Sequence, residues 1–314
     1  MLNRRFFSIL ILVLVVLAIT AQAQSPRSAV DRYDRGRQRY SKGDLDGAIA
    51  DFTRAIELSS YAMPQRHDWK ESVNFSEASS DADRITFIDP VTAAAYGNRA
   101  MARFGKGDLE GGIADCDRAL AINPGLIEVY NNRGVMLWSK GELDRAASDF
   151  DLVIAKKRHD AQAYDNRGNV RLSKGDIAGA LDDFDRAITL EPGRGESFCD
   201  RGEARRRKGD LQGALADFER GLELNPSLAW GYSGRGLVRR DRNEPREALT
   251  DLTRAIELDP SLGLTYAHRG LLLLRLGENA RAEEDFAQSL RLEPGLKEGL
   301  EKRIQAEKAQ HTAQ

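Results

Sequence analysis

Apolar side chains recur along most of this chain at the spacing of amphipathic helices, in paired segments separated by short polar turns. The stretch after Gly175-Asp176 illustrates the pattern, with apolar positions at i, i+3, i+4, i+7, i+10 and i+11: Ile177, Ala180, Leu181, Phe184, Ala187 and Ile188. This spacing places all six on one face of a helix. A second helical stretch precedes the Gly-Asp pair, and Pro192 marks the end of the unit. Residues 161–194 therefore predict a helix, a turn, a second helix and a Pro-marked turn.

The same pattern returns every 34 residues from Ala100 onward. Arg-Gly pairs mark six copies and Arg99-Ala100 marks the remaining one: Arg35-Gly36, Arg133-Gly134, Arg167-Gly168, Arg201-Gly202, Arg235-Gly236 and Arg269-Gly270. A fixed period of this size indicates one supersecondary unit that is copied and stacked. The chain of 314 residues therefore predicts a solenoid rather than the two domains that its length alone would suggest.

These units resemble the tetratricopeptide repeat, a helix–turn–helix family with aromatic, small and Pro positions in fixed order. An aromatic residue opens helix A, the first helix of the pair, in repeats 2–7: Tyr96, Tyr130, Tyr164, Phe198, Tyr232 and Tyr266. A second series occupies the wedge between the two helices: Phe52, Cys116, Phe150, Phe184, Phe218, Leu252 and Phe286. The resemblance covers about residues 29–296 and implies an all-α fold, a right-handed superhelical α-solenoid of seven helix–turn–helix units plus a C-terminal capping helix.

The phase of the repeat sets the expected boundaries. The segments are a signal peptide at 1–23, a linker at 24–28, repeat 1 at 29–62, an insertion at 63–92, repeat 2 at 93–126, repeat 3 at 127–160, repeat 4 at 161–194, repeat 5 at 195–228, repeat 6 at 229–262, repeat 7 at 263–296, and a capping helix and tail at 297–314. The insertion has no helical period, and its apolar residues suggest that it folds back on the solenoid. Repeat 3 ends irregularly, because Lys156 stands where a core Leu is expected.

Two charged series run unbroken through all seven repeats, an Arg in helix A and an Asp in the second helix, helix B. The arginines precede the small residue of the Arg-Gly pairs, and the aspartates lie beside the wedge position: Asp51, Asp115, Asp149, Asp183, Asp217, Asp251 and Asp285. Because both series neighbour residues that meet across the helix pair, we expect recurrent Arg–Asp ion pairs. The alternative is a ladder of arginines offered to an anionic ligand, which a matched carboxylate in every repeat disfavours.

The resemblance implies that helix A lines a concave groove. It places six peptide-contact candidates there: Tyr40, Phe104, Trp138, Asn131, Asn169 and Trp230. The same positions include Asp165 and Cys199. The aromatic residues of repeats 1–3 could instead pack against a neighbouring helix. Candidate contacts for an anion are Arg206, Arg207 and Arg240, whose alternative role is to complement the helix dipole at the end of helix A.

The N-terminus has a separate character. Arg4 and Arg5 precede an apolar run, and Ala21-Gln22-Ala23 supplies small residues at the −3 and −1 positions. This predicts a secretory signal peptide cleaved after Ala23, and hence a periplasmic or secreted protein. A retained membrane anchor is the alternative, although the apolar run is shorter than the roughly 20 residues that a spanning helix needs.

Composition and motifs narrow the function. The formal net charge of −2 gives no support to nucleic-acid binding. Cys116 and Cys199 lie about three repeats apart, too far for a disulfide. The four histidines lack metal-ligand spacing with one another or with Cys, and no phosphate loop or hydrolase motif is present. We therefore expect no cofactor, no metal and no enzymatic activity.

The resulting expectation is a non-enzymatic scaffold or adaptor of the cell envelope that binds a protein or peptide segment in the groove. The alternative is a protein that binds an anionic ligand or acidic polysaccharide through the basic ends of helix A in repeats 5 and 6. Membrane contact is expected only through the signal segment before cleavage, and the sequence leaves the oligomeric state open.

Overall fold

The computed structural model describes residues 26–62 and 90–312, which are α-helical apart from short turns and one 3-10 turn. The expected signal peptide and nearly all of the expected insertion lie outside these residues. The chain divides into two compact units, residues 1–158 (unit 1) and 159–314 (unit 2). This division coincides with the irregular end of repeat 3, where Lys156 is exposed instead of filling a core position.

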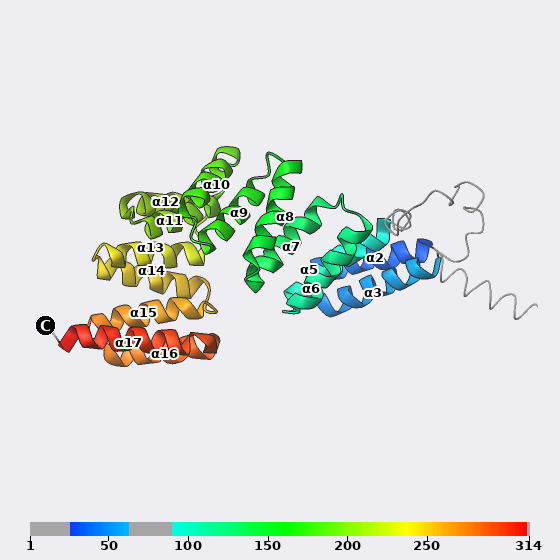
Figure 1. Cartoon of the computed structure of the whole chain (residues 1–314). Coiled ribbons are helices and arrows are strands. Elements are labelled where there is room, and N and C mark those ends of the chain that lie inside the picture. Colours follow the sequence, from blue (N-terminus) through cyan, green and yellow to red (C-terminus); the bar gives the residue numbers. More distant parts are fainter. Residues whose placement is uncertain (1–25, 63–89, 313–314) are drawn as a thin grey trace, which may run out of the picture. The chain divides into compact units, whose positions relative to one another are not determined.

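Unit 1 contains three helix pairs in its described part (Figure 1). The pairs are α2 (Pro26–Ser41) with α3 (Leu45–Ala62), α5 (Pro90–Gly105) with α6 (Leu109–Ile122), and α7 (Ile127–Lys140) with α8 (Leu143–Lys156). Each helix A packs on its own helix B, and each helix B packs on the next helix A, α3 on α5 and α6 on α7. Successive pairs therefore stack into one continuous layer of core contacts.

Unit 2 continues the same pattern with four pairs and a terminal helix (Figure 1). The pairs are α9 (Ala161–Ser173) with α10 (Ile177–Leu190), α11 (Gly195–Lys208) with α12 (Leu211–Leu224), α13 (Ala229–Asp241) with α14 (Pro245–Leu258), and α15 (Gly263–Arg275) with α16 (Asn279–Leu292). A 3-10 turn, Pro294–Leu296, leads into α17 (Lys297–Thr312), which packs on α15. The expected all-α solenoid of paired helices is confirmed.

Two helices begin earlier than the repeat phase indicates. Helix α2 begins at Pro26, inside the segment assigned to the linker, and α5 begins at Pro90, inside the segment assigned to the insertion. Proline suits the first turn of a helix because its missing N–H has no intrahelical partner there and its φ is already helical. If proline is interpreted only as a residue that ends helices, the starts of these two helices are placed too late in the chain.

Close approach of the two helices in a pair depends on the small residue after the arginine. A Cβ added to Gly168 would lie 2.6 Å from Cε1 of Phe184, which is fully buried in the wedge. Ala180 packs in the same cluster as that ring, and both Ala180 and Ala187 are also fully buried. The turn between the helices has its own requirement, because Gly175 has φ +83°, a conformation that side chains with a Cβ rarely adopt.

The expected Arg–Asp pairs form in all seven repeats. Arginine Nε donates to aspartate Oδ2 at 2.7–3.0 Å in every copy. In repeat 4, Nη2 of Arg167 also donates to the second oxygen of Asp183 at 2.6 Å, so the contact is bidentate. The seven aspartates are at most 5% exposed. The carboxylates are therefore buried within the helix pair, and the series is structural rather than a surface offered to a ligand.

The same arginines also join one repeat to the next. Nη1 of Arg133 donates to Asp117 of the preceding helix B at 2.7 Å, and Arg201 makes the equivalent contact to Asp185 at 2.7 Å. In repeats 2–7 each guanidinium also lies 5.2–5.7 Å from the centre of the aromatic ring that opens its helix. In repeats 3 and 5, one arginine therefore connects its own two helices with the previous repeat.

A second arginine, one turn further along helix A, completes the aspartate's coordination in five repeats. In repeat 4, Nη1 of Arg171 lies 2.9 Å from Oδ2 of Asp183 and 3.1 Å from the carbonyl oxygen of Gly179. Repeats 3 and 7 have Leu137 and Leu273 at this position, and both are buried at 1% exposure or less. These two repeats exchange an ionic contact for apolar packing.

Candidate functional site

The residues expected to contact a peptide are divided between the two units. In unit 1, Tyr40 on α2 is exposed, and Phe104 on α5 is half-buried, as are Asn131 and Trp138 on α7. Asn169 and Trp230 lie in unit 2, as do the three arginines expected to contact an anion. The two groups belong to separate compact units.

Two residues assigned to the groove by the resemblance are instead buried, so that expectation was wrong for them. Asp165 is 3% exposed, and Cys199 is completely buried in a cluster with Phe218 and Leu222. Burial raises the pKa of the Cys199 thiol to about 12, and that of Cys116 likewise to about 12. Both cysteines are free.

A cavity of about 800 Å³ lies within unit 2. Its lining comes mainly from α11, α13 and α15, the helix A copies of repeats 5–7, and from α17. Asp200, Gly234 and His268 occupy one repeat position on the three helices, and all of them line the cavity, as do Arg206 and Arg240 at another shared position. Helix A copies stack in register, so a position that faces the cavity in one repeat faces it in the next.

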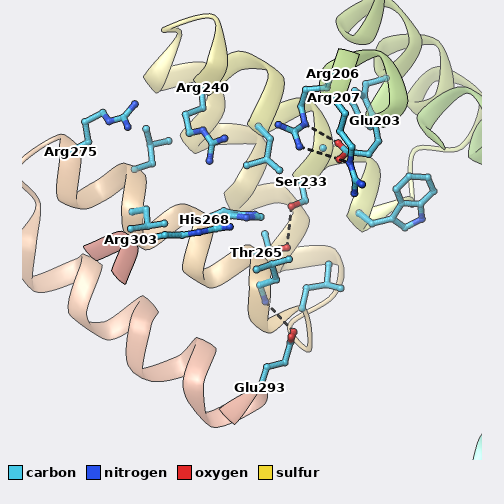
Figure 2. A pocket seen from close by; sticks show the side chains of 18 of the residues that line it. Glu203, Arg206, Arg207, Ser233, Arg240, Thr265, His268, Arg275, Glu293 and Arg303 are labelled. Atoms are coloured by element: carbon cyan, nitrogen blue, oxygen red, sulfur yellow. Dashed lines mark hydrogen bonds and ion pairs between the residues drawn. The ribbon is translucent and has the colours of Figure 1, made fainter. Parts of the chain in front are cut away.

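One end of the cavity is aromatic and apolar. Trp230, near the start of α13, is 38% exposed, and Leu264 lies at the equivalent position of α15 and is also exposed. Beside them, the hydroxyls of Ser233 and Thr265 form a hydrogen bond of 3.1 Å (Figure 2). An exposed tryptophan that lines a cavity is a frequent anchor in recognition sites.

The other end is cationic. Arg240 lies ten residues beyond Trp230 on the same helix, about 15 Å along the axis at ~1.5 Å per residue. Arg206, Arg275 and Arg303 also line the cavity from α11, α15 and α17. Figure 2 shows these guanidinium groups arranged around the same space. The cavity is therefore polarised along its helices, with an apolar and a positively charged end.

Most of these arginines already have a carboxylate partner. Arg206 and Arg207 each donate from Nε to Glu203 at 2.8 Å, and Nη1 of Arg206 donates to Asp241 at 3.0 Å. Arg240 donates to the same Asp241 from Nη2 at 2.8 Å. The three arginines expected to contact an anion are thus brought together at one cavity, but as members of an internal ion-pair network.

Two basic groups at this end have no such partner within the described part of the chain. Arg303 makes no hydrogen bond or ion pair with another described residue. His268 is 8% exposed, and its Nδ1 is buried without a hydrogen-bond partner among the described residues. Burial lowers the pKa of His268 to about 4, with further lowering by the charges of Arg240, Arg303 and Arg206.

A pair of carboxylates lies beside the cavity at the α9–α11 contact. Oδ2 of Asp165 accepts a 2.6 Å hydrogen bond from Ser197, and Oδ2 of Asp200 accepts one of 3.1 Å from Asn169. Burial raises the pKa of Asp165 to about 6. The pKa of Asp200 rises to about 7 through burial and the nearby charge of Asp165. Asn169, expected to contact a peptide, is therefore engaged with this internal pair.

Sequence reasoning missed His268, Arg275 and Arg303 as members of the site. Motif spacing gave no reason to select a lone histidine or Arg275. The signal that could have found His268 is its repeat position, 68 residues after Asp200, where helix A faces the cavity. Arg303 lies 34 residues after Arg269, so the arginine series continues into α17, and the phase of the repeat could have drawn attention to it.

Within residues 26–62 and 90–312, no three His, Cys, Asp or Glu side chains are grouped so that they could hold a metal ion. Among the helices of those same ranges, none combines the length and apolar character needed to cross a membrane.

Comparison with solved structures shows a shared fold. A tetratricopeptide repeat protein from Parabacteroides merdae ATCC 43184 matches with a TM-score of 0.68 at 18% identity, over 90% of this chain and 99% of the other. TTC0263, a thermophilic protein of the same repeat class from Thermus thermophilus, has a TM-score of 0.52 at 22% identity, over 58% of this chain and 98% of the other. The Cut9–Hcn1 hetero-tetramer of APC/C has a TM-score of 0.62 at 15% identity, over 86% of this chain and 54% of the other.

A search of curated proteins found no match. The sequence model of the family described as Tetratricopeptide repeat matches residues 73–127, 166–229 and 233–297. These three regions make up more than half of the chain, and within the described residues they cover α5, α6 and most of α9–α16. The chain therefore belongs to the tetratricopeptide repeat family.

Proposed function

We propose that this protein is a non-enzymatic interaction scaffold that holds a peptide segment of a partner protein in the unit 2 cavity. The family consists largely of proteins that bind other proteins, which supports the general class. The single observation that carries the specific proposal is the polarised cavity, which runs along three consecutive helix A copies from exposed Trp230 to the arginines around His268.

The dimensions of the cavity suit a short extended segment. The two ends of the cavity, marked by Trp230 and Arg240, are about 15 Å apart along α13. An extended peptide advances about 3.3 Å per residue, so about four or five residues connect the two ends. The volume of about 800 Å³ lies in the range of functional ligand cavities, ~300–1,000 Å³.

The charge pattern favours a peptide over an acidic polysaccharide. A polyanion needs a row of available cations, whereas Arg206, Arg207 and Arg240 are paired with Glu203 or Asp241. A peptide that offers one charged and one apolar group matches the lining better. Binding to a polyanion would also weaken strongly with salt, since the Debye length falls from about 10 Å at 0.1 M to about 3 Å at 1 M.

Selection of binding peptides from a random displayed heptapeptide library tests the proposal. The enriched peptides are expected to compete with one another and to lose at least tenfold in affinity on Trp230→Ala, because an aromatic anchor is removed. Trp138→Ala, in unit 1, serves as the matched control and is expected to leave binding unchanged. Failure to enrich any peptide, or peptides that bind Trp230→Ala equally well, would refute the proposal.

We also propose that the protein acts outside the cytoplasm, in the periplasm or after secretion. Support comes from the sequence alone, through the arginines, apolar run and Ala21-Gln22-Ala23 at the N-terminus. N-terminal sequencing of the protein recovered from the producing cell tests this, and a mature chain that begins at Gln24 is expected. A chain that retains residues 1–23 would contradict cleavage.

A further inference from the structure

Two acidic side chains face each other between the fourth and fifth repeats, Asp165 on α9 and Asp200 on α11. In the phase of the repeat, Asp165 occupies the position of Tyr33, and Asp200 occupies that of Asn98. Those two residues are in direct contact between repeats 1 and 2, where the amide of Asn98 donates to the hydroxyl of Tyr33 at 2.9 Å. The same two positions therefore direct the carboxyl groups of repeats 4 and 5 toward each other.

The hydrogen bonds around the two carboxyl groups agree with this placement. The hydroxyl of Ser197, one turn before Asp200 on α11, donates to Oδ2 of Asp165 at 2.6 Å. The amide of Asn169, one turn after Asp165 on α9, donates to Oδ2 of Asp200 at 3.1 Å. Both bonds connect the same two helices, in neighbouring turns. The carboxyl groups therefore lie within about one helical turn of each other, ~5 Å along the axes.

This combination of two acids is particular to repeats 4 and 5. At the same two positions, the other neighbouring repeats combine uncharged or weakly basic side chains: Tyr33 with Asn98, Gly97 with Asn132, Asn131 with Asn166, Cys199 with Gly234, and Ser233 with His268. Two ionised carboxylates at short range in a buried contact disfavour each other's charge. The contact is therefore at its most favourable when one of the two groups holds a proton.

The surroundings supply too little positive charge to balance both carboxylates. Asp165 is 3% exposed, and its Oδ1 is buried without a hydrogen-bond partner among the described residues. Nε of Arg194 lies 2.9 Å from Oδ2 of Asp165, and its charge acts on both carboxyl groups. Glu191 acts on Asp165 with the opposite sign, and Glu196 does so on Asp200. One guanidinium thus stands against several negative charges.

The other charged groups on the helices around this contact are engaged with different partners. These pairs are Arg167 and Arg171 with Asp183, Arg201 with Asp185 and Asp217, Arg205 with Asp217, and Glu203 with Arg206 and Arg207. Of the residues by which α13 lines the cavity, only Arg240 is charged, and it donates to Asp241. The thiol of Cys199, beside Asp200 in the chain, is neutral because burial raises its pKa to about 12.

The pKa values of both groups are displaced in the direction that this arrangement requires. Burial raises the pKa of Asp165 to about 6, against the opposing effects of Ser197 and Arg194. Burial and the charge of Asp165 raise the pKa of Asp200 to about 7. The pair therefore binds a proton on the acidic side of neutrality and releases it to water as the pH rises through about 7.

We propose that the contact between repeats 4 and 5 is a proton-operated switch, in which one proton bound by Asp165 and Asp200 keeps α9 and α11 closely packed, and its release leaves two opposed charges that loosen the contact. Asp200 also lines the unit 2 cavity, of which α11 forms a wall. Acidic pH therefore tightens this wall of the cavity, and alkaline pH loosens it. The switch is a property of the chain itself, so it goes beyond the proposed peptide binding and does not depend on it.

Hydrogen–deuterium exchange of the intact protein measures this contact without a ligand. Exchange of the α9 and α11 amides is compared at about pH 5.5 and about pH 8, with labelling times scaled to the intrinsic exchange rate at each pH. Asp200 has a pKa of about 7 in the closed contact and regains an ordinary value of about 4 when the helices separate. Protection should therefore be about thirtyfold lower at pH 8 than at pH 5.5. The amides of α5 and α6 in unit 1 are the internal reference, and their protection should be equal at both pH values.

Neutral variants separate the acidic pair from a general effect of pH. Asp200→Asn keeps an acceptor for Asn169 but cannot ionise, so the difference in protection should fall below about threefold. Asp182→Asn, at an exposed position of α10, is the matched control and should keep the full difference. If circular dichroism shows that Asp200→Asn does not fold, Asp165→Asn provides the same comparison. Equal protection of wild-type α9 and α11 at both pH values, or a full difference that persists in the neutral variant, would overturn the proposal.

Discussion

The buried Arg–Asp network makes a quantitative prediction about stability, and repeat 4 is the best place to test it. Asp183 is 3% exposed and accepts from Nε and Nη2 of Arg167 at 3.0 and 2.6 Å. Nη1 of Arg171 lies 2.9 Å from Oδ2 of the same carboxylate. The substitution Asp183→Ala therefore leaves two guanidinium groups in a partly buried setting without their common carboxylate.

The expected cost follows from this geometry. Removing one member of a buried ion pair destabilises by about 3–5 kcal/mol, mainly because the remaining charge is uncompensated. The Arg167 and Arg171 side chains are only 16% and 32% exposed, so water replaces the lost carboxylate incompletely. For a unit of this size, about 1 kcal/mol lowers the melting temperature by roughly 2–4 °C, and Asp183→Ala should lower it by roughly 10 °C.

Urea and thermal unfolding followed by circular dichroism measure this effect. Asp182→Ala is the matched control, because Asp182 is the preceding residue of the same helix but is exposed. That control is expected to change the free energy of unfolding by no more than about 0.5 kcal/mol. If Asp183→Ala and Asp182→Ala unfold at the same midpoint, the network contributes nothing and its structural interpretation is wrong.

Three further predictions concern packing, pH and thiol reactivity. Gly168→Ala should reduce the free energy of unfolding by about 1–3 kcal/mol, because the added Cβ would overlap Phe184 in the wedge between the helices. Gly193→Ala is the control, and it should leave the melting temperature unchanged, because no atom lies within 4 Å of its added Cβ. The pKa of Asp200 is raised to about 7 in the folded protein, so the contribution of this residue to stability falls as the pH rises from about 4 to about 7. Asp200→Asn should melt at a higher temperature than the wild type at pH 8 and at the same temperature at pH 4. An equal difference in melting temperature at both pH values would contradict the raised pKa. Cys116 and Cys199 are buried with pKa values of about 12, so a thiol-reactive dye at pH 8 should label them only after unfolding, and rapid labelling of the native protein would refute their burial.

The sequence was sufficient for the fold because each repeat carries the same local information. Amphipathic spacing defines the helices, and the small residue that faces the wedge position defines how closely they approach. The strict pairing of Arg167 with Asp183, and of their equivalents, could be predicted because both series neighbour residues that must touch across the helix pair. The early helix starts at Pro26 and Pro90 were missed, since one proline can either begin or end a helix and its local sequence does not decide between them.

The site was predictable only in part. Repeat phase placed Trp230, Arg206 and Arg240 on the face that lines the cavity, and the structure brings them together there. It also placed Asp165 on that face, although burial against the neighbouring helix removes it from solvent. The sequence therefore determines which face of helix A a repeat position lies on. Whether the residue is exposed in one particular repeat depends on the side chains of the adjacent repeats.

The sequence by itself determined the paired helices, their stacking and the buried ionic contacts, because these depend on interactions that recur within a short span of chain. The tertiary structure alone decided which charges of the described residues remain without a partner. Arg206 and Arg240 share Asp241, whereas Arg303 and His268, 35 residues apart in the chain, meet at one cavity with no described carboxylate between them. Arg303 continues the arginine series 34 residues after Arg269, but none of the described residues supplies the helix B aspartate that its equivalents contact, so its surroundings are set by how α17 packs against α15.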